Sequence, residues 1–400
     1  MFDSSFFTAN RQRLYNLLQP ESFLVITANM PLQRSAEVPY GFEQDGNFWY
    51  LTGLEMPDWL LIFDHETAQE LLIMPHVSSV RAAFDGSLTA DQASAISGVK
   101  QVLDKKAGAA LLKKLCQSKK RAYGIAPQPS VYFDIFTNPA QRRLKRRLVG
   151  PEFVDIRKDI SAMRALKQPQ EIRAIQTAID ITAQGLKEVY AQLPSLKYEY
   201  EVEALLSYAF RRRGFNHAFH PIIAAGKHSC TFHYESAQGP LGKGVLLLDV
   251  GAQAGRYAAD ISRVVSLGQI TDRQQAIFNA VVRAQRDIIA LLQPGQSVKV
   301  YLKEVEAIML REMIPLGILS KTAIPHDIYT NMQHAIGHGL GIDVHDPLGQ
   351  PKTFKEGMVL TVEPGIYSSK DSTGVRIEDD ILITATGPKI LSAAIPIGLK

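Results

Sequence analysis

The first half of the chain alternates short apolar runs with stretches of helical pattern. Residues 22–28, 59–63 and 71–74 have the length and composition of strands. Residues 4–18 and 89–97 have the spacing of helices. Strands and helices that alternate along a chain pack as layers, so we predict an α/β domain here.

A long amphipathic helix opens the second half. Pro169 stands where the first residue of a helix is expected, and isoleucines follow at near-helical spacing as far as Ile181. We place the domain boundary near residue 160, between an N-terminal domain of residues 1–160 and a C-terminal domain of residues 161–400. A length of 400 residues also favours two domains over one core.

The second half repeats one order of elements, two helices followed by a hairpin. The pattern predicts helices at about residues 169–192 and 198–213 before the first hairpin, and at about 271–292 and 299–315 before the second. We therefore expect an α+β domain, and the repeated order hints at an internal duplication.

The composition is that of a globular protein without a strong charge bias. Hydrophobic residues make up 46% and charged residues 21%, and the net charge of +4 does not indicate a nucleic-acid or membrane partner. Basic stretches at residues 105–121 and 142–147 are interleaved with Leu and Ala at helical spacing. We interpret them as solvated helix faces rather than as a nucleic-acid surface.

Targeting features and cysteine usage favour the cytoplasm. The N-terminus lacks a basic start and an apolar stretch of signal-peptide length, and the longest apolar runs are far short of the roughly 20 residues that span a bilayer. The two cysteines, Cys116 and Cys230, lie far apart, which excludes a disulfide framework and favours a reducing compartment. We expect a cytoplasmic protein.

Two aspartates lie symmetrically about a turn in residues 244–265. Asp249 and Asp260 are equidistant from Ala254–Gly255, where the flanking apolar strands would reverse. In a hairpin folded there, the two carboxylates lie opposite each other or nearly so. Like charges opposite each other destabilise a sheet, so a cation is expected between them.

The same geometry recurs in residues 358–383. Glu363 and Glu378 are equidistant from Lys370–Asp371, inside a polar turn. Either pair alone is compatible with solvent-facing strand acids, but the apolar neighbours on both sides argue against exposure. Together the two hairpins provide four candidate metal ligands.

A glycine-rich segment contributes histidines to the candidate site. His334, His338 and His345 are interspersed with glycines at 337, 339 and 341, which argue against a regular helix and allow close approach to a ligand. The segment is therefore not a helical His-Glu-x-x-His zinc site. Four carboxylates and one imidazole suit a pair of Mn²⁺, Co²⁺ or Fe²⁺ ions better than a structural zinc, and such a pair can generate hydroxide near neutral pH.

At these positions the chain resembles the pita-bread metallopeptidases, most closely the aminopeptidase P family with its relative prolidase. The motifs are Leu-Leu-Asp249-Val-Gly, Asp260-Ile-Ser-Arg, His334-x-x-Gly-His338-Gly-Leu-Gly-x-Asp-Val-His345, Val-Glu363-Pro-Gly-Ile-Tyr367 and Val-Arg376-Ile-Glu378-Asp. The segment that begins at Tyr40 and the linker Met163-Arg-Ala-Leu-Lys-Gln-Pro-Gln-Glu-Ile also fit, so the resemblance covers nearly the whole chain. One departure is Ser35 after Arg34, where relatives often have Asn.

The resemblance implies a fold and a set of metal ligands. It implies a creatinase/aminopeptidase P-like α/β N-terminal domain and a pita-bread C-terminal domain that binds two divalent ions, Mn²⁺ first, with Co²⁺, Fe²⁺ and Zn²⁺ as alternatives. Asp249 would bind one ion, and His338 and Glu363 would bind the other. Asp260 and Glu378 would bridge both ions.

Further roles follow from the same motifs. Glu363 would move the proton between water and the leaving amine, and His233 and His345 would contact the substrate and stabilise the tetrahedral intermediate. A pocket for proline would be formed by His334, Tyr367 and Arg376. We interpret the remaining histidines of the second half as structural: His217, His220, His228 and His326.

The implied activity is hydrolysis of the N-terminal Xaa-Pro bond of peptides with proline second, by a hydroxide that bridges two metal ions. The alternative is prolidase, which cleaves only Xaa-Pro dipeptides. A non-catalytic peptide-binding relative is a further alternative, but such relatives lose ligands that are present here. Relatives form dimers or tetramers in which the N-terminal domain helps to shape the neighbour's site, so we expect a homo-oligomer.

Overall fold

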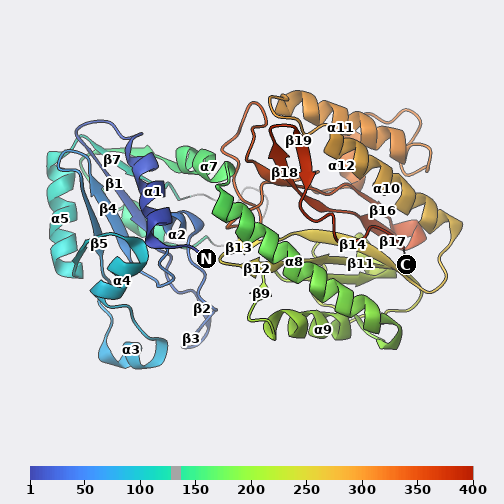
Figure 1. Ribbon diagram of the computed structural model, residues 1–400, viewed down its shortest axis with the longest axis horizontal. Helices are drawn as coiled ribbons and strands as arrows, with labels where there is room; N and C mark the ends of the chain where they lie inside the picture. Colours follow the sequence, from blue (N-terminus) through green and yellow to red (C-terminus); the bar gives the residue numbers. More distant parts are fainter. Residues whose placement is uncertain (128–136, 400) are drawn as a thin grey trace. The chain divides into compact units, whose positions relative to one another are not determined.

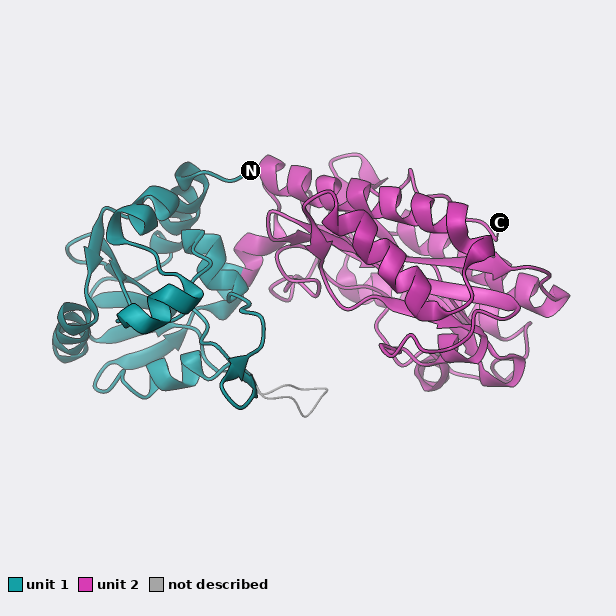
Figure 2. Cartoon of the chain, turned by 90° about the horizontal axis from the view of Figure 1, so that it is seen from below, with its two compact units in different colours: residues 1–160 teal, residues 161–400 magenta. Residues whose placement is uncertain are grey.

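A six-stranded mixed sheet forms the centre of the amino-terminal unit (Figure 1). The computed structural model describes residues 1–127 and 137–399, and the chain divides into two units, Met1–Ile160 and Ser161–Lys400 (Figure 2). The sheet has the order β6-β5-β4-β1-β7-β8, with β1 antiparallel to β4 and parallel to β7. Its strands are β1 (Ser22–Thr27), β4 (Leu60–Asp64), β5 (Gln69–Ile73), β6 (Gln101–Leu103), β7 (Arg121–Gly124) and β8 (Glu152–Asp155), and a separate hairpin pairs β2 (Gln33–Ser35) with β3 (Val38–Pro39).

Helices cover both faces of this sheet. Successive side chains of a strand point to opposite faces, so one strand can contact helices on both sides. On β4, Phe63 stacks on Tyr15 with ring centroids 3.7 Å apart, whereas Ile62 joins a hydrophobic cluster with Leu112 and Leu115. Tyr15 belongs to α1 and the two leucines to α5, so the predicted α/β layering is confirmed. The helices are α1 (Ser4–Tyr15), α2 (Gly46–Thr52), α3 (Ser79–Asp85), α4 (Ala90–Ser97), α5 (Lys105–Ser118) and α6 (Ala140–Lys145).

The ends of these helices follow local capping rules. Asp3 accepts hydrogen bonds from the first backbone N–H groups of α1, and Thr89 forms a capping box with Gln92 at the start of α4. Most of the two basic stretches lies in α5 and α6, with most of the charged side chains exposed, as expected, whereas Arg121 belongs to β7. Lys119 is an exception, because it is buried and pairs with Asp64.

Helices surround the strands of the carboxy-terminal unit (Figure 1). Pro169 occupies the start of α8, as predicted. Helix α8 contacts β12 and β13, and α10 contacts β15 and β17. Helix α7 (Arg157–Ala165) spans the boundary between the two units. The helices of the carboxy-terminal unit are α8 (Pro169–Gln192), α9 (Glu199–Arg211), α10 (Asp272–Ala290), α11 (Val298–Met313) and α12 (Pro325–Asn331), with 3-10 turns η1 (Leu193–Ser195), η2 (Gly226–Cys230) and η3 (Ser369–Asp371). No helix among the described residues is long and apolar enough to cross a bilayer.

Each of the two predicted hairpins consists of two successive ladders rather than one. In the first, β11 pairs with β14 and β12 with β13; in the second, β15 pairs with β18 and β16 with β17. The strands are β9 (Asn216–His217), β10 (Ile222–Ala225), β11 (Gly244–Val250), β12 (Ala252–Ala254), β13 (Tyr257–Ala258), β14 (Ile261–Leu267), β15 (Val359–Val362), β16 (Gly365–Ser368), β17 (Thr373–Arg376), β18 (Asp379–Thr384) and β19 (Gly387–Ile390). Asp260, Glu363 and Glu378 lie in the interruptions between these ladders, whereas Asp249 lies within β11.

The register of the first hairpin differs from the prediction by one residue at the turn. Asp249 pairs with Ser262, and the chain reverses at Gly255–Arg256 instead of Ala254–Gly255. Gly255 and Arg256 both have positive φ, of 53° and 72°, which is the backbone of a tight two-residue hairpin turn. Asp249 and Asp260 are therefore offset along the ladder instead of directly opposite.

The second hairpin has the predicted register. Thr361 pairs with Asp380, and Gly365 pairs with Arg376, so both ladders share one register. Continuing that register places Glu363 opposite Glu378, in the interruption between the ladders.

Candidate metal centre

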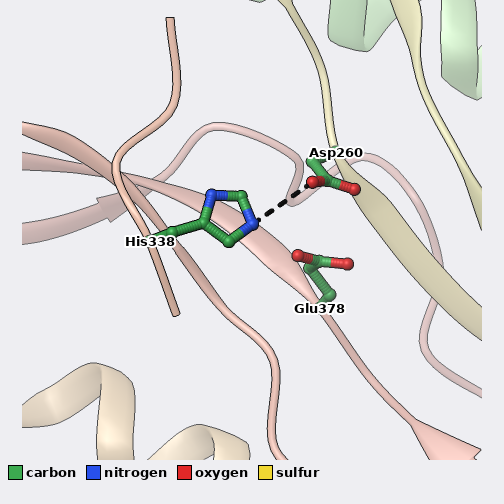
Figure 3. Close-up of side chains that lie close together, drawn as sticks. All are labelled: Asp260, His338 and Glu378. Carbon is green, nitrogen blue, oxygen red and sulfur yellow. Dashed lines mark ion pairs between the residues drawn. The ribbon is translucent and has the colours of Figure 1, made fainter. Parts of the chain in front are cut away.

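Three side chains from distant parts of the second half converge in the carboxy-terminal unit. Asp260, His338 and Glu378 each offer a ligand atom within 4.8 Å of the others. Both carboxylates point toward the imidazole, and the His338 Nε2 lies 3.5 Å from the Asp260 Oδ2 (Figure 3). Asp260 directly precedes β14 and Glu378 directly precedes β18, so each is held at the end of a strand.

The other two predicted ligands border this cluster on different sides. The Glu363 Oε1 lies 3.5 Å from the His338 Nε2. Asp249 is buried and pairs through its Oδ2 with Arg376, while its buried Oδ1 has no hydrogen-bond partner among the described residues. The structure thus places Glu363 on the His338 side and Asp249 on the Arg376 side.

Glycines allow the His338 loop to lie directly against β15. The His338 backbone N–H donates to the Thr361 Oγ1, and the Thr361 N–H donates to the His338 carbonyl oxygen at 2.9 Å. A Cβ atom at Gly337 would lie 2.1 Å from the Thr361 carbonyl oxygen. The loop is irregular, as predicted, and His338 is fixed by backbone bonds on the strand that leads to Glu363.

Burial and mutual repulsion raise the pKa of two carboxyl groups in the cluster. The pKa of Asp260 is raised well above its usual value by burial and by Asp249 and Asp380. Burial and the charge of Asp260 likewise raise the pKa of Glu378. Ionising both groups is therefore costly in the protein alone.

A nearby histidine has the opposite effect on Glu363. Burial alone would raise the pKa of Glu363, but the hydrogen bond and charge of His334, 3.3 Å away, hold it below its usual value. A buried set of carboxylates with an orphaned oxygen on Asp249 fits divalent cations, which would supply the missing positive charge. Oxygen ligands with one imidazole suit Mn²⁺, Co²⁺, Fe²⁺ or Zn²⁺.

The three residues predicted for a proline pocket form one hydrogen-bonded chain. The Tyr367 hydroxyl lies 2.8 Å from the His334 Nε2 and accepts a bond from the Arg376 Nη1 at 3.0 Å. Burial raises the pKa of Tyr367 to about 12, so the phenol stays protonated at neutral pH. The Phe232 ring packs edge-on against Tyr367, with centroids 4.6 Å apart.

The two histidines predicted to contact substrate lie beside the cluster and are exposed. The ring of His345 lies 4.2 Å from that of His338, and His345 interacts electrostatically with His233. Of the histidines predicted to be structural, His217 and His228 bond to Ser207 and Glu199. His220 bonds weakly to a neighbouring carbonyl, and His326 is exposed.

Sequence reasoning missed Ser262, which links two candidate site residues. Its hydroxyl donates to the Glu378 Oε2 and accepts from the Arg376 Nε, both at 2.8 Å. The signal was present, because Ser262 lies in the same short motif as Asp260. A serine two residues after an aspartate is too common to attract notice before the fold brings Glu378 to it.

Two interrupted hairpins, outer helices and a buried carboxylate–imidazole centre define a metal-dependent hydrolase of the pita-bread fold. The chain belongs to metallopeptidase family M24, whose family model matches residues 173–385. The model of the aminopeptidase P N-terminal domain matches residues 7–123.

The chain is similar to relatives and to solved structures over nearly its full length. A Haemophilus influenzae protein named Xaa-Pro aminopeptidase is 33% identical over 98% of this chain and 94% of its own length. The Escherichia coli Xaa-Pro aminopeptidase is 31% identical over 97% of this chain and 94% of its own. The structure of E. coli aminopeptidase P with the inhibitor Pro-Leu has a TM-score of 0.84 at 28% identity and covers 99% of this chain and 96% of that one. A zinc-substituted form of the E. coli enzyme with product has a TM-score of 0.82 at the same identity, over 99% of this chain and 96% of that one.

Proposed function

We propose that this protein is an Xaa-Pro aminopeptidase that removes the first residue of peptides with proline second. The observation that carries the proposal is the convergence of Asp260, His338 and Glu378, with Glu363 and Asp249 at their borders. Membership of family M24 and the amino-terminal match to aminopeptidase P support the same activity.

Two divalent ions fit this arrangement of ligands. Asp249 would bind one ion, His338 and Glu363 would bind the other, and Asp260 and Glu378 would bridge them. Two such ions would supply a shared, activated water as the hydroxide for attack on the scissile carbonyl. We propose Mn²⁺ as the metal, because the carboxylate-rich set favours a hard ion.

The protein's own side chains would then handle the proton and the substrate. Glu363 would carry the proton from water to the leaving amine, and its bond to His334 keeps the carboxylate ionised and ready to accept it. His233 and His345 would face the substrate and stabilise the developing oxyanion. The chain of His334, Tyr367 and Arg376, with Phe232 packed on it, would bound the pocket for the proline ring.

The test is peptide cleavage by purified protein loaded with Mn²⁺, using an Xaa-Pro-Xaa tripeptide and the matching Xaa-Pro dipeptide. We expect release of the first residue from the tripeptide. Cleavage confined to the dipeptide would identify a prolidase. No cleavage of either peptide with Mn²⁺, Co²⁺, Fe²⁺ or Zn²⁺, by protein that binds these metals, would contradict the proposal and favour a peptide-binding role.

Assembly and location belong to the same proposal. We expect a dimer or tetramer in which the domain of residues 1–160 contributes to oligomerisation and to shaping the substrate site. Light scattering coupled to gel filtration would report the mass, and a monomeric mass at assay concentration would contradict this part. Two free cysteines far apart in the sequence support a cytoplasmic location.

A further inference from the structure

Two buried cations of the Met163-Arg-Ala-Leu-Lys-Gln-Pro-Gln-Glu-Ile motif contact the loop that carries His338 and His345. Arg164 lies in the last turn of α7 and Lys167 lies between α7 and α8, and both are almost fully buried. Nothing in the proposed chemistry uses them directly. Burying two cations is costly unless they are paired, so their partners indicate what they do.

Both cations converge on Asp346. The Arg164 Nη2 donates to the Asp346 Oδ1, and the Lys167 Nζ donates to the Asp346 Oδ2 at 2.8 Å. Arg164 also pairs with Asp343 in the same loop, although that carboxylate is 46% exposed. Burial alone would raise the pKa of Asp346, but the two cations hold it below its usual value. Asp346 is therefore a buried carboxylate with a cation on each oxygen.

Asp346 in turn fixes the ends of the loop. Its backbone N–H donates to the Gly339 carbonyl oxygen at 2.7 Å, and its Oδ1 accepts from the Asp343 N–H. Gly339 directly follows His338, and Asp346 directly follows His345. The contact thus closes a loop with one functional histidine at each end.

The glycines of this loop fit against the same contact. A Cβ atom at Gly339 would lie 2.3 Å from the Asp346 carbonyl oxygen. A Cβ atom at Gly341 would lie 2.6 Å from the Asp346 Oδ2 and 3.0 Å from the Lys167 Nζ. The space that glycine leaves at 341 is occupied by the ion pair itself.

We propose that Arg164, Lys167 and Asp346 are positioning residues that hold His338 in the orientation that binds metal. The ion pairs fix the conformation of the loop from His338 to Asp346. The loop in turn sets the orientation of the His338 imidazole, which binds metal together with Asp260 and Glu378. The inference rests on the metal centre of the proposed function. The linker motif would thus support metal binding indirectly, through Asp346 and the loop, without contacting the ions.

The test measures metal binding, by calorimetric titration of metal-free protein with MnCl₂. We expect Asp346→Asn to weaken Mn²⁺ binding by roughly 10- to 100-fold, the usual effect of losing a residue that orients a metal ligand. Gly341→Ala should weaken it in the same direction without removing any charge, because the added methyl group displaces Asp346 and Lys167. If Asp346→Asn does not fold, the Mn²⁺ affinity of Gly341→Ala tests the proposal instead.

A matched variant separates positioning from a general loss of stability. Glu312→Gln removes a buried carboxylate that pairs with Arg283 between α10 and α11. We expect this variant to lose thermal stability and to bind Mn²⁺ as the wild type does. Folded Asp346→Asn or Gly341→Ala protein with wild-type affinity, or equal weakening in Glu312→Gln, would overturn the proposal. Failure of the wild type to cleave a tripeptide would bear only on the proposed function.

Discussion

At the scale of single residues, three of the four candidate carboxylates lie where hydrogen-bonded ladders are interrupted. Asp260 stands between β13 and β14, and Glu378 stands between β17 and β18. At such positions the backbone is free of a regular cross-strand partner, so the side chain can turn inward beside its neighbour. The arrangement concentrates carboxyl groups whose negative charge a bound metal cation would offset.

Replacing Asp260 by Asn should therefore remove metal and activity together. We expect stoichiometric metal to fall and kcat/KM for a tripeptide to drop by roughly a thousand-fold or more, because a metal that is not held cannot activate water. Elemental analysis and peptide assays would measure both effects. Asp180→Asn, an exposed acid on α8, is the control and should change neither. Full activity in Asp260→Asn would show that Asp260 is no ligand.

His217 gives stability a defined dependence on pH. Burial, with a contribution from His220, lowers the pKa of His217 to about 4. Between about pH 6.5 and pH 4 the unfolded chain therefore binds a proton that the folded protein does not, so stability falls as pH falls through this window. Its bond to the Ser207 hydroxyl, 2.8 Å long, is consistent with a neutral ring.

The expected test is the pH dependence of Tm in His217→Gln. Between pH 6.5 and pH 5 the wild type should lose about 1 kcal/mol more than the variant, after discounting for the partly exposed ring. Differential scanning calorimetry at matched ionic strength would measure the difference. Parallel Tm profiles for the two proteins would rule out a lowered pKa at this position.

Single site residues could be predicted from the sequence where an acidic side chain stands among apolar neighbours. Acids within apolar runs of the sequence, such as Asp249 and Glu363, stand out because water-facing strands alternate in polarity. The pairing of Arg376 with Asp249, or of Arg164 with Asp346, has no such local signal. Those partners are more than a hundred residues apart in the chain, so only the tertiary fold brings them together.

At the scale of elements, one buried carboxylate organises the segment that carries His233. Glu199, at the start of α9, is fully buried and accepts four hydrogen bonds from residues 225–239. Its Oε1 accepts from the Ala225 N–H and the His228 Nδ1. Its Oε2 accepts from the Tyr234 hydroxyl and the Gly239 N–H. His233 therefore lies in a loop tied to a helix through a single side chain.

Glu199→Gln should loosen this segment, because an amide nitrogen cannot accept the bonds that one carboxylate oxygen now accepts. We expect the free energy of unfolding to fall by about 1–3 kcal/mol. The KM for a tripeptide should rise more than kcat falls, since His233 is proposed to contact substrate. Glu203→Gln on the same helix is the control for both measurements, and an unchanged KM in folded Glu199→Gln would contradict the link to His233.

The helices were easier to predict than the hairpins. Helix α8 has the predicted bounds, and α10 and α11 end within two residues of theirs, because the apolar period of a helix extends over several turns. A hairpin register depends on its turn, and Gly255 and Arg256 adopt a conformation that the apolar pattern does not encode. Helix α12 was missed because it has only seven residues.

At the scale of the whole molecule, metal should stabilise one unit and not the other. All five candidate ligands belong to Ser161–Lys400. A ligand present at a hundred times its dissociation constant stabilises the state that binds it by about 2.7 kcal/mol. Calorimetric scans of the full chain with Mn²⁺ or with EDTA should therefore resolve a metal-sensitive transition and a metal-insensitive one.

A substitution in the first unit can assign the metal-insensitive unfolding transition to that unit. Arg11→Met removes a fully buried cation that bonds Glu70 within Met1–Ile160, and it should lower that transition alone. A metal-induced shift of the transition that Arg11→Met affects would contradict the assignment of the ligands to the second unit.

The same distribution of ligands sets an order of events during protein synthesis. The amino-terminal unit is complete at residue 160, whereas the last ligand, Glu378, is added much later. At about 5–20 residues per second, the ribosome would need roughly 10–40 s to cover that stretch. The first domain can fold while the second is still a nascent chain, but the centre cannot take up metal until both hairpins have emerged. The first metal ion is therefore bound only after almost the whole chain has been synthesised.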